Sequence, residues 1–289
     1  MAAGDYLYRF VFEDFGVRGE FVRLAASWNA VQERHDYPAH VETELGKALA
    51  AVSLLSGTIK FKGSLIMQTQ GDGPVNALVA QATEQRAIRG MAHFDETREP
   101  IEGESALGNG RLVLTAESPA GERYQGIVGL EGDGIEHALE GYFQQSEQLA
   151  TRLWLSADSE SAAGLFLQKM PTDHAEDDDW ERVVMLADTI KDEELLALDV
   201  KEILHRLFHE ESVRLFDPEP VAFRCGCSRE RIETVLINMG QKDVESIIEE
   251  KGAVEADCEF CNARYVFDAV DVAALFNEVP TVDPGTTTQ

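Results

Sequence analysis

The stretch FRCGCSRER, from Phe223 to Arg231, holds two of the four cysteines of the 289-residue chain, and CEFC, from Cys258 to Cys261, holds the other two. Two close pairs separated by a folded segment allow four sulfurs to reach the corners of one tetrahedron, ~2.3 Å from Zn²⁺. All seven histidines precede residue 210, so the donors here are thiolates. We expect one Zn²⁺ on four ligands: Cys225, Cys227, Cys258 and Cys261.

The residues around the two pairs predict a small module, 221–289. Ser228 is a favourable N-cap for a helix that runs to Met239 and stops at Gly240. Gly226 is expected to let the chain fold tightly between its two ligands, and Asn262 to take the left-handed conformation. The other expected elements are a helix over 243–251, strands over 253–257 and 264–267, a helix from residue 271 and a disordered tail over 280–289.

The expected core of this module is thin, and a domain of this size usually needs an additional staple. Structural zinc contributes roughly 10–16 kcal/mol to the folding of such domains, so loss of the metal should unfold the module. The expected core residues are Ile232, Leu236, Met239, Val244, Ile247, Ile248, Tyr265, Val266 and Phe267.

Residues 1–171 predict a large α+β domain. Alternating aromatic residues over 6–12 indicate a strand, and apolar residues at helical spacing over 38–59 indicate a helix. Few helices among many strands favour a mixed or antiparallel sheet over a doubly wound parallel one. Further strands are expected over 63–70, 75–82, 87–94, 111–116, 124–128, 151–157 and 164–170, with a second helix over 135–149.

Residues 172–220 predict an acidic helical linker, with 16 acidic and 5 basic residues and a net charge of −11. Apolar residues keep helical spacing over 183–190 and 200–208, and Asp199 is placed as an N-cap. Helices with this much like charge are metastable alone, so their apolar faces must dock on another surface.

The net charge of the whole chain, −28, disfavours binding to nucleic acid or to anionic membrane surfaces. The N-terminal residues lack the pattern of a signal peptide, and no apolar stretch has the ~18 residues of a membrane span. We expect a cytoplasmic protein, in which clustered cysteines are metal ligands or redox groups rather than structural disulfides.

The Cys-x-Cys spacing of the first pair is tighter than usual for zinc, so a disulfide between these two residues would be strained and easily reduced. The chain has no other cysteine, so oxidation can pair only these four. Both features favour a redox switch over a structural zinc site in a regulatory complex, which remains the alternative.

Other signals point to simpler roles. A thioredoxin-like oxidoreductase at Cys258 and Cys261 is a further alternative, although that chemistry requires a helix N-terminus in a βαβ fold. His205 and His209 share one helix face, which we expect to be solvated or docked rather than metal-binding. The glycine-rich segment 129–134 lacks the order of a nucleotide-binding loop and predicts a turn. No Ser/His/Asp constellation stands out, so an enzyme is not expected.

The cysteine stretches resemble those of the redox-regulated 33 kDa heat-shock chaperonin family, and the resemblance extends over nearly the whole chain. It includes LIMQTQGDGPVN at 65–76, GERYQGIVGLEG at 121–132, YFQQSEQLATR at 142–152 and DTIKDEEL at 188–195. Glycine stands between the first two cysteines, where polar residues also occur in that family.

The resemblance implies a bacterial, ATP-independent holdase that is monomeric, zinc-bound and inactive when reduced. Oxidants are expected to form the disulfides Cys225–Cys227 and Cys258–Cys261, with release of zinc, unfolding of the module and loss of the docking partner of the linker helices. Apolar surface then binds unfolded client proteins, and the oxidised form is a homodimer.

Overall fold

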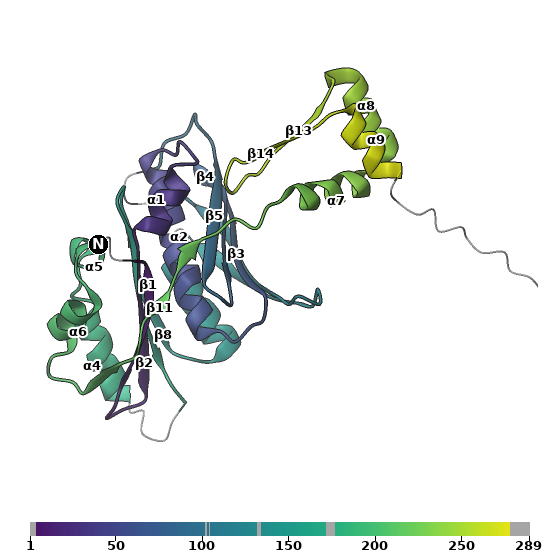
Figure 1. The fold of residues 1–289 in the computed structure, drawn as a ribbon. Helices are drawn as coiled ribbons and strands as arrows, with labels where there is room; N and C mark the ends of the chain where they lie inside the picture. The colour runs from purple at the N-terminus through teal and green to yellow at the C-terminus, as the bar shows by residue number, and fades with distance from the viewer. Residues whose placement is uncertain (1–3, 102, 104, 132–133, 172–176, 278–289) are drawn as a thin grey trace, which may run out of the picture. The chain divides into compact units, whose positions relative to one another are not determined.

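The computed structural model describes residues 4–101, 103, 105–131, 134–171 and 177–277 (Figure 1). The chain forms two compact units, Met1–Arg224 and Cys225–Gln289. Both contain helices and strands, which confirms the α+β class. The described part of the acidic segment 172–220 belongs to the first unit. The boundary expected at residue 171 adjoins residues outside the described ranges and stays a prediction.

Two six-stranded sheets form the frame of the first unit. The strands of the first sheet are β1 (Tyr6–Phe12), β2 (Val17–Leu24), β8 (Thr151–Ala157), β9 (Ala162–Lys169), β10 (Val213–Leu215) and β11 (Glu219–Pro220). They lie in the order β10-β1-β2-β9-β8, with β11 also paired to β1, and every pair is antiparallel.

The strands of the second sheet are β3 (Ser64–Gly71), β4 (Val75–Thr83), β5 (Ala87–Phe94), β6 (Asn109–Glu117), β7 (Arg123–Glu131) and β12 (Ala222–Phe223). They lie in the order β12-β5-β4-β3-β6-β7. The pairing of β12 with β5 is parallel and the others are antiparallel, so this sheet is mixed, as the sequence predicts.

Helix α2 (Ala39–Thr58) contacts strands of both sheets and confirms the helix expected over 38–59 (Figure 1). Its residues are buried on all sides, as expected of a helix that is covered on two faces. A Cβ added to Gly46 would lie 2.5 Å from the Cβ of Ala157, and one added to Gly164 would lie 2.7 Å from Leu54. These two glycines therefore permit the close approach of α2 to the first sheet.

The sequence predictions for 1–171 miss β2 and the short helix α1 (Ala26–Gln32). Strand β2 contains a glycine and a glutamate, and Glu20 is only 2% exposed. These residues interrupt the apolar pattern of the strand, so the sequence does not predict it although it lies in the middle of the sheet. The helix expected over 135–149 is α3 (Gly134–Tyr142), continued as the π-helix η1 (Phe143–Glu147). The turn expected over 129–134 is wrong for residues 129–131, which belong to β7, and for Gly134, which begins α3; residues 132–133 lie outside the described ranges.

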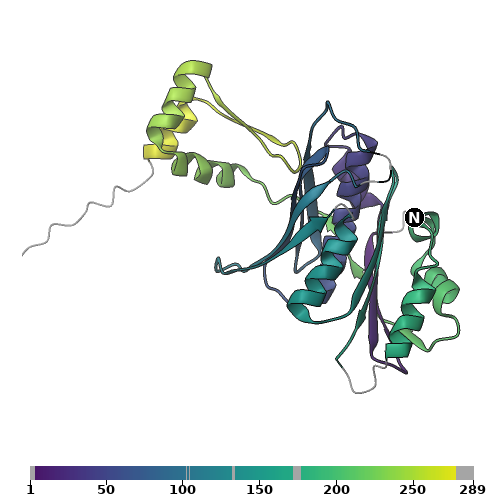
Figure 2. The same cartoon turned by 180° about the vertical axis from the view of Figure 1, so that it is seen from behind.

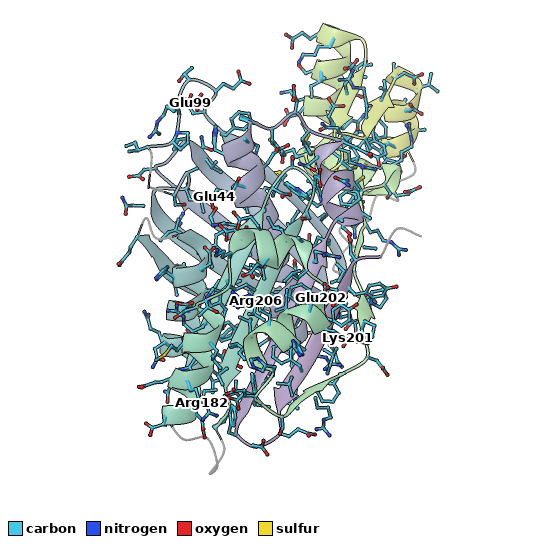
Figure 3. The ribbon with its side chains drawn as sticks, turned by 90° about the vertical axis from the view of Figure 1, so that its left-hand side faces the viewer. Glu44, Glu99, Arg182, Lys201, Glu202 and Arg206 are labelled. Carbon is cyan, nitrogen blue, oxygen red and sulfur yellow. The ribbon has the colours of Figure 1, made fainter. Side chains whose placement is uncertain are left out.

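Three helices of the acidic segment, α4 (Asp177–Ala187), α5 (Asp192–Ala197) and α6 (Val200–Phe208), follow one another (Figure 2). Asp199 caps α6 by accepting hydrogen bonds from the backbone N–H groups of Lys201 (2.9 Å) and Glu202 (3.0 Å), as predicted. Arg182 of α4 pairs with Glu211, and Arg206 of α6 pairs with Glu194. Figure 3 labels the two arginines.

The apolar faces of these helices pack on the first sheet and form a second core, separate from the one around α2. We call it the linker core. The helices contribute Val183, Ala187, Leu195, Val200, Ile203, Leu204, Leu207 and Phe208, and the strands and the β1–β2 turn contribute Phe10, Phe12, Phe15, Val17, Phe21, Ala163, Leu165 and Leu167. The surface on which the helices dock is therefore the first sheet.

Residues 219–224 lie across both sheets and are called the strap. Its strand β11 pairs with β1, β12 pairs with β5, and Val221 is buried in the core around α2. Glu219 forms ion pairs with Arg9 and Arg86, each at 2.6 Å. The N–H of Arg224 donates to the carbonyl of Ile88 at 3.0 Å. The chain is thus held to the first unit up to the residue before Cys225.

The second unit contains α7 (Arg229–Met239), α8 (Gln241–Lys251), the hairpin β13 (Val254–Asp257) and β14 (Arg264–Phe267), and α9 (Ala269–Asn277). These elements confirm the sequence predictions, including the end of α7 at Gly240. The predicted core is wrong at Met239 and Val266, which are 45% and 44% exposed. The buried residues are Leu236, Val244, Val254, Phe267 and Val272. The tail over 280–289 lies outside the described ranges.

Candidate metal centre

The first cysteine pair lies between the strap and helix α7. Cys227 directly precedes Ser228, whose hydroxyl accepts the backbone N–H of Arg231 at 3.4 Å and so begins the helix. Gly226 does not have positive φ, and a Cβ there would lie 3.2 Å from Nη1 at the end of the Arg231 side chain. Glycine at this position is therefore not required by backbone strain, contrary to the expectation from the sequence.

The second pair lies in the turn between β13 and β14. The backbone N–H groups of Cys261 and Asn262 both donate to the carbonyl of Cys258, at 3.2 and 2.7 Å. The N–H of Cys258 in turn donates to the carbonyl of Ala263 at 3.0 Å. Asn262 has φ of 54°, which confirms its left-handed conformation. This folded turn brings the sulfurs of Cys258 and Cys261 within 4.8 Å of each other.

The structure brings the four predicted ligands together. Their Sγ atoms all lie within 4.8 Å of one another, with Cys225 and Cys258 3.6 Å apart and Cys227 and Cys261 3.3 Å apart. Four sulfurs at ~2.3 Å from a central Zn²⁺ lie about 3.8 Å from each other. The observed spacing surrounds a point that suits one tetrahedral ion, and all four residues are partly buried.

The electrostatics of the cluster also fit a cation. Burial raises the pKa of Cys225, but hydrogen bonds from the Cys227 N–H and from the neighbouring thiols outweigh burial and bring it to about 7. Burial and the adjacent thiols raise the pKa of Cys261 to about 12, and burial raises that of Cys258. Four thiolates this close together repel one another, and a positive ion such as Zn²⁺ would stabilise them together.

Tyr265 is a site residue that the sequence analysis assigned only to the core. Its hydroxyl donates to Sγ of Cys227 at 3.2 Å, and this hydrogen bond raises the pKa of Tyr265 to about 12. The residue lies on β14, four positions after Cys261. Its place opposite Cys227 depends on the hairpin register and on α7, so spacing along the chain does not reveal it.

His205 is exposed on α6 and His209 is exposed at its C-cap, with ring centroids 5.7 Å apart. This placement confirms the expected helix face. Within the described residues, the four cysteines form the one cluster of three or more potential ligands. None of the helices there has both the length and the apolar character needed to cross a membrane.

Fold and site together define a class of protein with a large two-sheet unit that carries an acidic helical layer, followed by a small unit closed by four thiols. The sequence model of the family described as Hsp33 protein matches residues 5–268. A 33 kDa chaperonin of Nitrosococcus oceani is 54% identical over 95% of both chains. One from Pseudomonas paraeruginosa is 46% identical over 99% of both chains. The chain therefore belongs to the Hsp33 family, which confirms the resemblance seen in the sequence.

The fold is also similar to a crystal structure of a 33 kDa chaperonin from Thermotoga maritima. The TM-score is 0.81, and the match covers 94% of this chain and 98% of that one at 23% identity. The likeness supports the two-unit architecture over almost the full length.

Proposed function

We propose that the protein is an ATP-independent chaperone that binds unfolded clients and is controlled by the oxidation of its four cysteines. The observation that carries this proposal is the convergence of the four thiols within a unit whose described residues form a core of five buried apolar side chains. Family membership supports the chaperone activity, because the curated relatives are named chaperonins. A binding protein is thus favoured over an enzyme.

In the reduced state, Cys225, Cys227, Cys258 and Cys261 would hold one Zn²⁺, with Tyr265 orienting the sulfur of Cys227. The ion supplies a positive charge that keeps all four thiols deprotonated and cross-links the hairpin to the start of α7. The small core alone is insufficient for a stable unit of this size.

Oxidation by a peroxide would pair the sulfurs as Cys225–Cys227 and Cys258–Cys261. For each disulfide, two thiolates lose two electrons and one S–S bond forms. The O–O bond of one peroxide accepts the electrons and, with two protons, leaves as two waters or as water and an alcohol. Two disulfides remove all four thiolate donors, so the residues no longer retain the ion and the second unit unfolds.

Client binding would follow from release of α4 to α6. The described contacts of these helices are with the first sheet. Release therefore means that the helices separate from the first sheet and that the linker core opens. The chain runs from α6 through β10 and the strap to Cys225. The second unit is therefore connected to the helices through a short stretch of backbone. The exposed apolar faces would then bind unfolded proteins and a second copy of the chain, making the oxidised protein a dimer in the bacterial cytoplasm.

The test uses the zinc-loaded, reduced full chain at a mild heat-stress temperature. Peroxide is expected to release one zinc per chain, measured with a chromogenic chelator, and to produce suppression of client aggregation, measured by light scattering without ATP. Peptide mapping by mass spectrometry then identifies the disulfides. Zinc release without suppression of aggregation would contradict the proposal and favour a purely structural zinc site. Catalytic turnover of a small disulfide would instead favour a thiol-disulfide oxidoreductase.

The test variant is Cys258→Ser. The matched control is Ser246→Ala, at an exposed position on α8. Cys258→Ser is expected to hold zinc weakly and to suppress aggregation partly without oxidant. Ser246→Ala should behave as the parent protein. Mapping that finds Cys225–Cys258 and Cys227–Cys261 would reject the proposed pairing while preserving the switch.

A further inference from the structure

A cavity of about 390 Å³ lies between the two sheets of the first unit. Its walls come from β2 and β9 of the first sheet, from β3, β6 and β7 of the second, from η1 and from the residues that follow α2. Binding sites for small molecules are typically concave spaces of about 300–1,000 Å³ with mostly apolar walls and a few fixed polar groups. The proposed switch makes no use of this space.

Most of the cavity wall is apolar. Leu65 and Leu114 line it from the second sheet, and Phe143 lines it from η1; all three are at most 3% exposed. Ile59, Ala116, Tyr124, Tyr142 and Leu149 also line it. Such a wall favours an alkyl chain or an aromatic ring.

A rigid cation lies at the polar side of the cavity. Arg18 of β2 donates through Nε and Nη2 to Oε1 of Gln168, at 3.1 and 2.6 Å. Gln168 is fully buried and donates in turn to the hydroxyl of Thr151 at 2.8 Å. The chain Arg18–Gln168–Thr151 therefore fixes the plane of a guanidinium group before any ligand arrives, and such a group is suited to bind a carboxylate.

The other charged residues of the lining are Lys60 and Glu147. Glu147 accepts a long hydrogen bond of 3.5 Å from the hydroxyl of Tyr142, so one of its carboxylate oxygens already has a partner. Two cations against one carboxylate make the lining net positive, in a chain whose net charge is −28. Glu20, on the same strand, does not line this cavity, but it lines a neighbouring one together with Arg18, and its charge acts on the guanidinium.

The backbone of the cavity wall is irregular where η1 contributes to it. A π-helix is rare and occurs frequently at functional sites. It ends at Gln148, a non-glycine residue with φ of 57°, and the N–H of Leu149 bonds back to the carbonyl of Phe143 at 3.2 Å. A regular α-helix would place Phe143, Glu147 and Leu149 differently, so the irregularity shapes the wall.

We propose that this cavity binds a small amphipathic monocarboxylate, with its carboxylate on Arg18 and its alkyl chain or ring against Leu65, Leu114 and Phe143. The site is separate from the metal centre and does not depend on the proposed switch. Because the ligand contacts strands of both sheets, it stabilises the first unit by mass action.

Decanoate is the probe, titrated by calorimetry into the reduced, zinc-loaded full chain. We expect one decanoate per chain and a rise in the melting temperature of the first unit. Arg18→Gln should weaken binding by about tenfold or more, because it removes a charge-assisted hydrogen bond. Ala116→Phe, which fills the cavity and leaves the charges in place, should abolish binding.

Arg89→Gln is the matched control, because Arg89 also donates to a glutamine, Gln81, at 2.8 Å and does not line the cavity. It should bind decanoate as the parent does. If Arg18→Gln does not fold, the exposed Lys60→Gln, expected to weaken binding by about two- to fivefold, tests the charge requirement. No binding at about 1 mM decanoate, equal binding of uncharged decanol, or unchanged binding by Ala116→Phe would each overturn the proposal.

Discussion

Tyr265 is positioned to support the proposed metal centre without being one of the four proposed ligands. It fixes the sulfur of Cys227 through the 3.2 Å hydrogen bond described above. Groups that orient metal ligands typically contribute about 10–100-fold to affinity. Tyr265→Phe is therefore expected to lower zinc affinity by about tenfold, measured by competition with a chelator. Tyr6→Phe, in the first unit, is the control and should leave the affinity unchanged.

Glu20 is the residue whose ionisation should affect the stability of the first unit. Burial raises its pKa to about 7, although the Thr58 hydroxyl and the charges of Arg18, Arg86 and Arg9 act in the opposite direction. The folded state therefore holds a proton more tightly than the unfolded state, where a glutamate titrates near ~4.3. Between these two pKa values stability falls as pH rises, by an amount on the order of 3–4 kcal/mol.

Glu20→Gln removes this titration and should flatten the stability profile between pH 4.5 and 7.5. Denaturant unfolding followed by the emission of Trp28, which is fully buried in the same unit, measures the effect. Relative to the parent, the variant should gain stability as pH rises. An identical slope in the two proteins would show that Glu20 ionises normally in the fold.

At the scale of elements, the docking of α6 is the contact that the proposed switch must break. Phe208 is 1% exposed and meets Phe12 edge-to-face, with ring centroids 5.0 Å apart. Phe208→Ala should cost about 3–5 kcal/mol of docking free energy. The reduced variant should then suppress client aggregation without oxidant. Met185→Ala on α4, where the side chain is 70% exposed, should remain inactive until oxidised.

The elements also show how far the sequence alone leads. Strands with regular alternation and helices with clear caps, such as α6 after Asp199 and α7 after Ser228, could be predicted because local chemistry determines them. Strand β2 could not, because Glu20 is buried by tertiary contacts that no local pattern contains. The same reason applies to the site: cysteine spacing predicts that the four thiols converge, which the structure shows, but Tyr265 reaches Cys227 only through the folded hairpin.

At the scale of the whole molecule, the three tryptophans report on different layers. Trp28 is buried in the core around α2, whereas Trp154 and Trp180 pack against the linker core. The indole N–H of Trp154 donates to Asp188 at 3.1 Å. On oxidation, variants that retain only Trp154 or only Trp180 should become accessible to acrylamide. A variant that retains only Trp28 should stay shielded, because the two sheets remain folded.

Removal of zinc from the reduced protein tests the second unit separately. A strong chelator should abolish the helical signal of α7 to α9 in circular dichroism and leave Trp28 emission unchanged. Adding zinc back should restore the signal, because the ligands are still thiols. A full helical signal without metal would mean that the five-residue core suffices for folding.

The strap determines which C-terminally shortened chains should stay free of aggregation. A chain that ends at Arg224 loses all four thiols but keeps every strap hydrogen bond to β1 and β5. A chain that ends at Pro218 exposes the backbone edge of β5, and bare strand edges invite pairing between molecules. The six residues that separate these two endpoints therefore decide between a soluble fragment and an aggregating one.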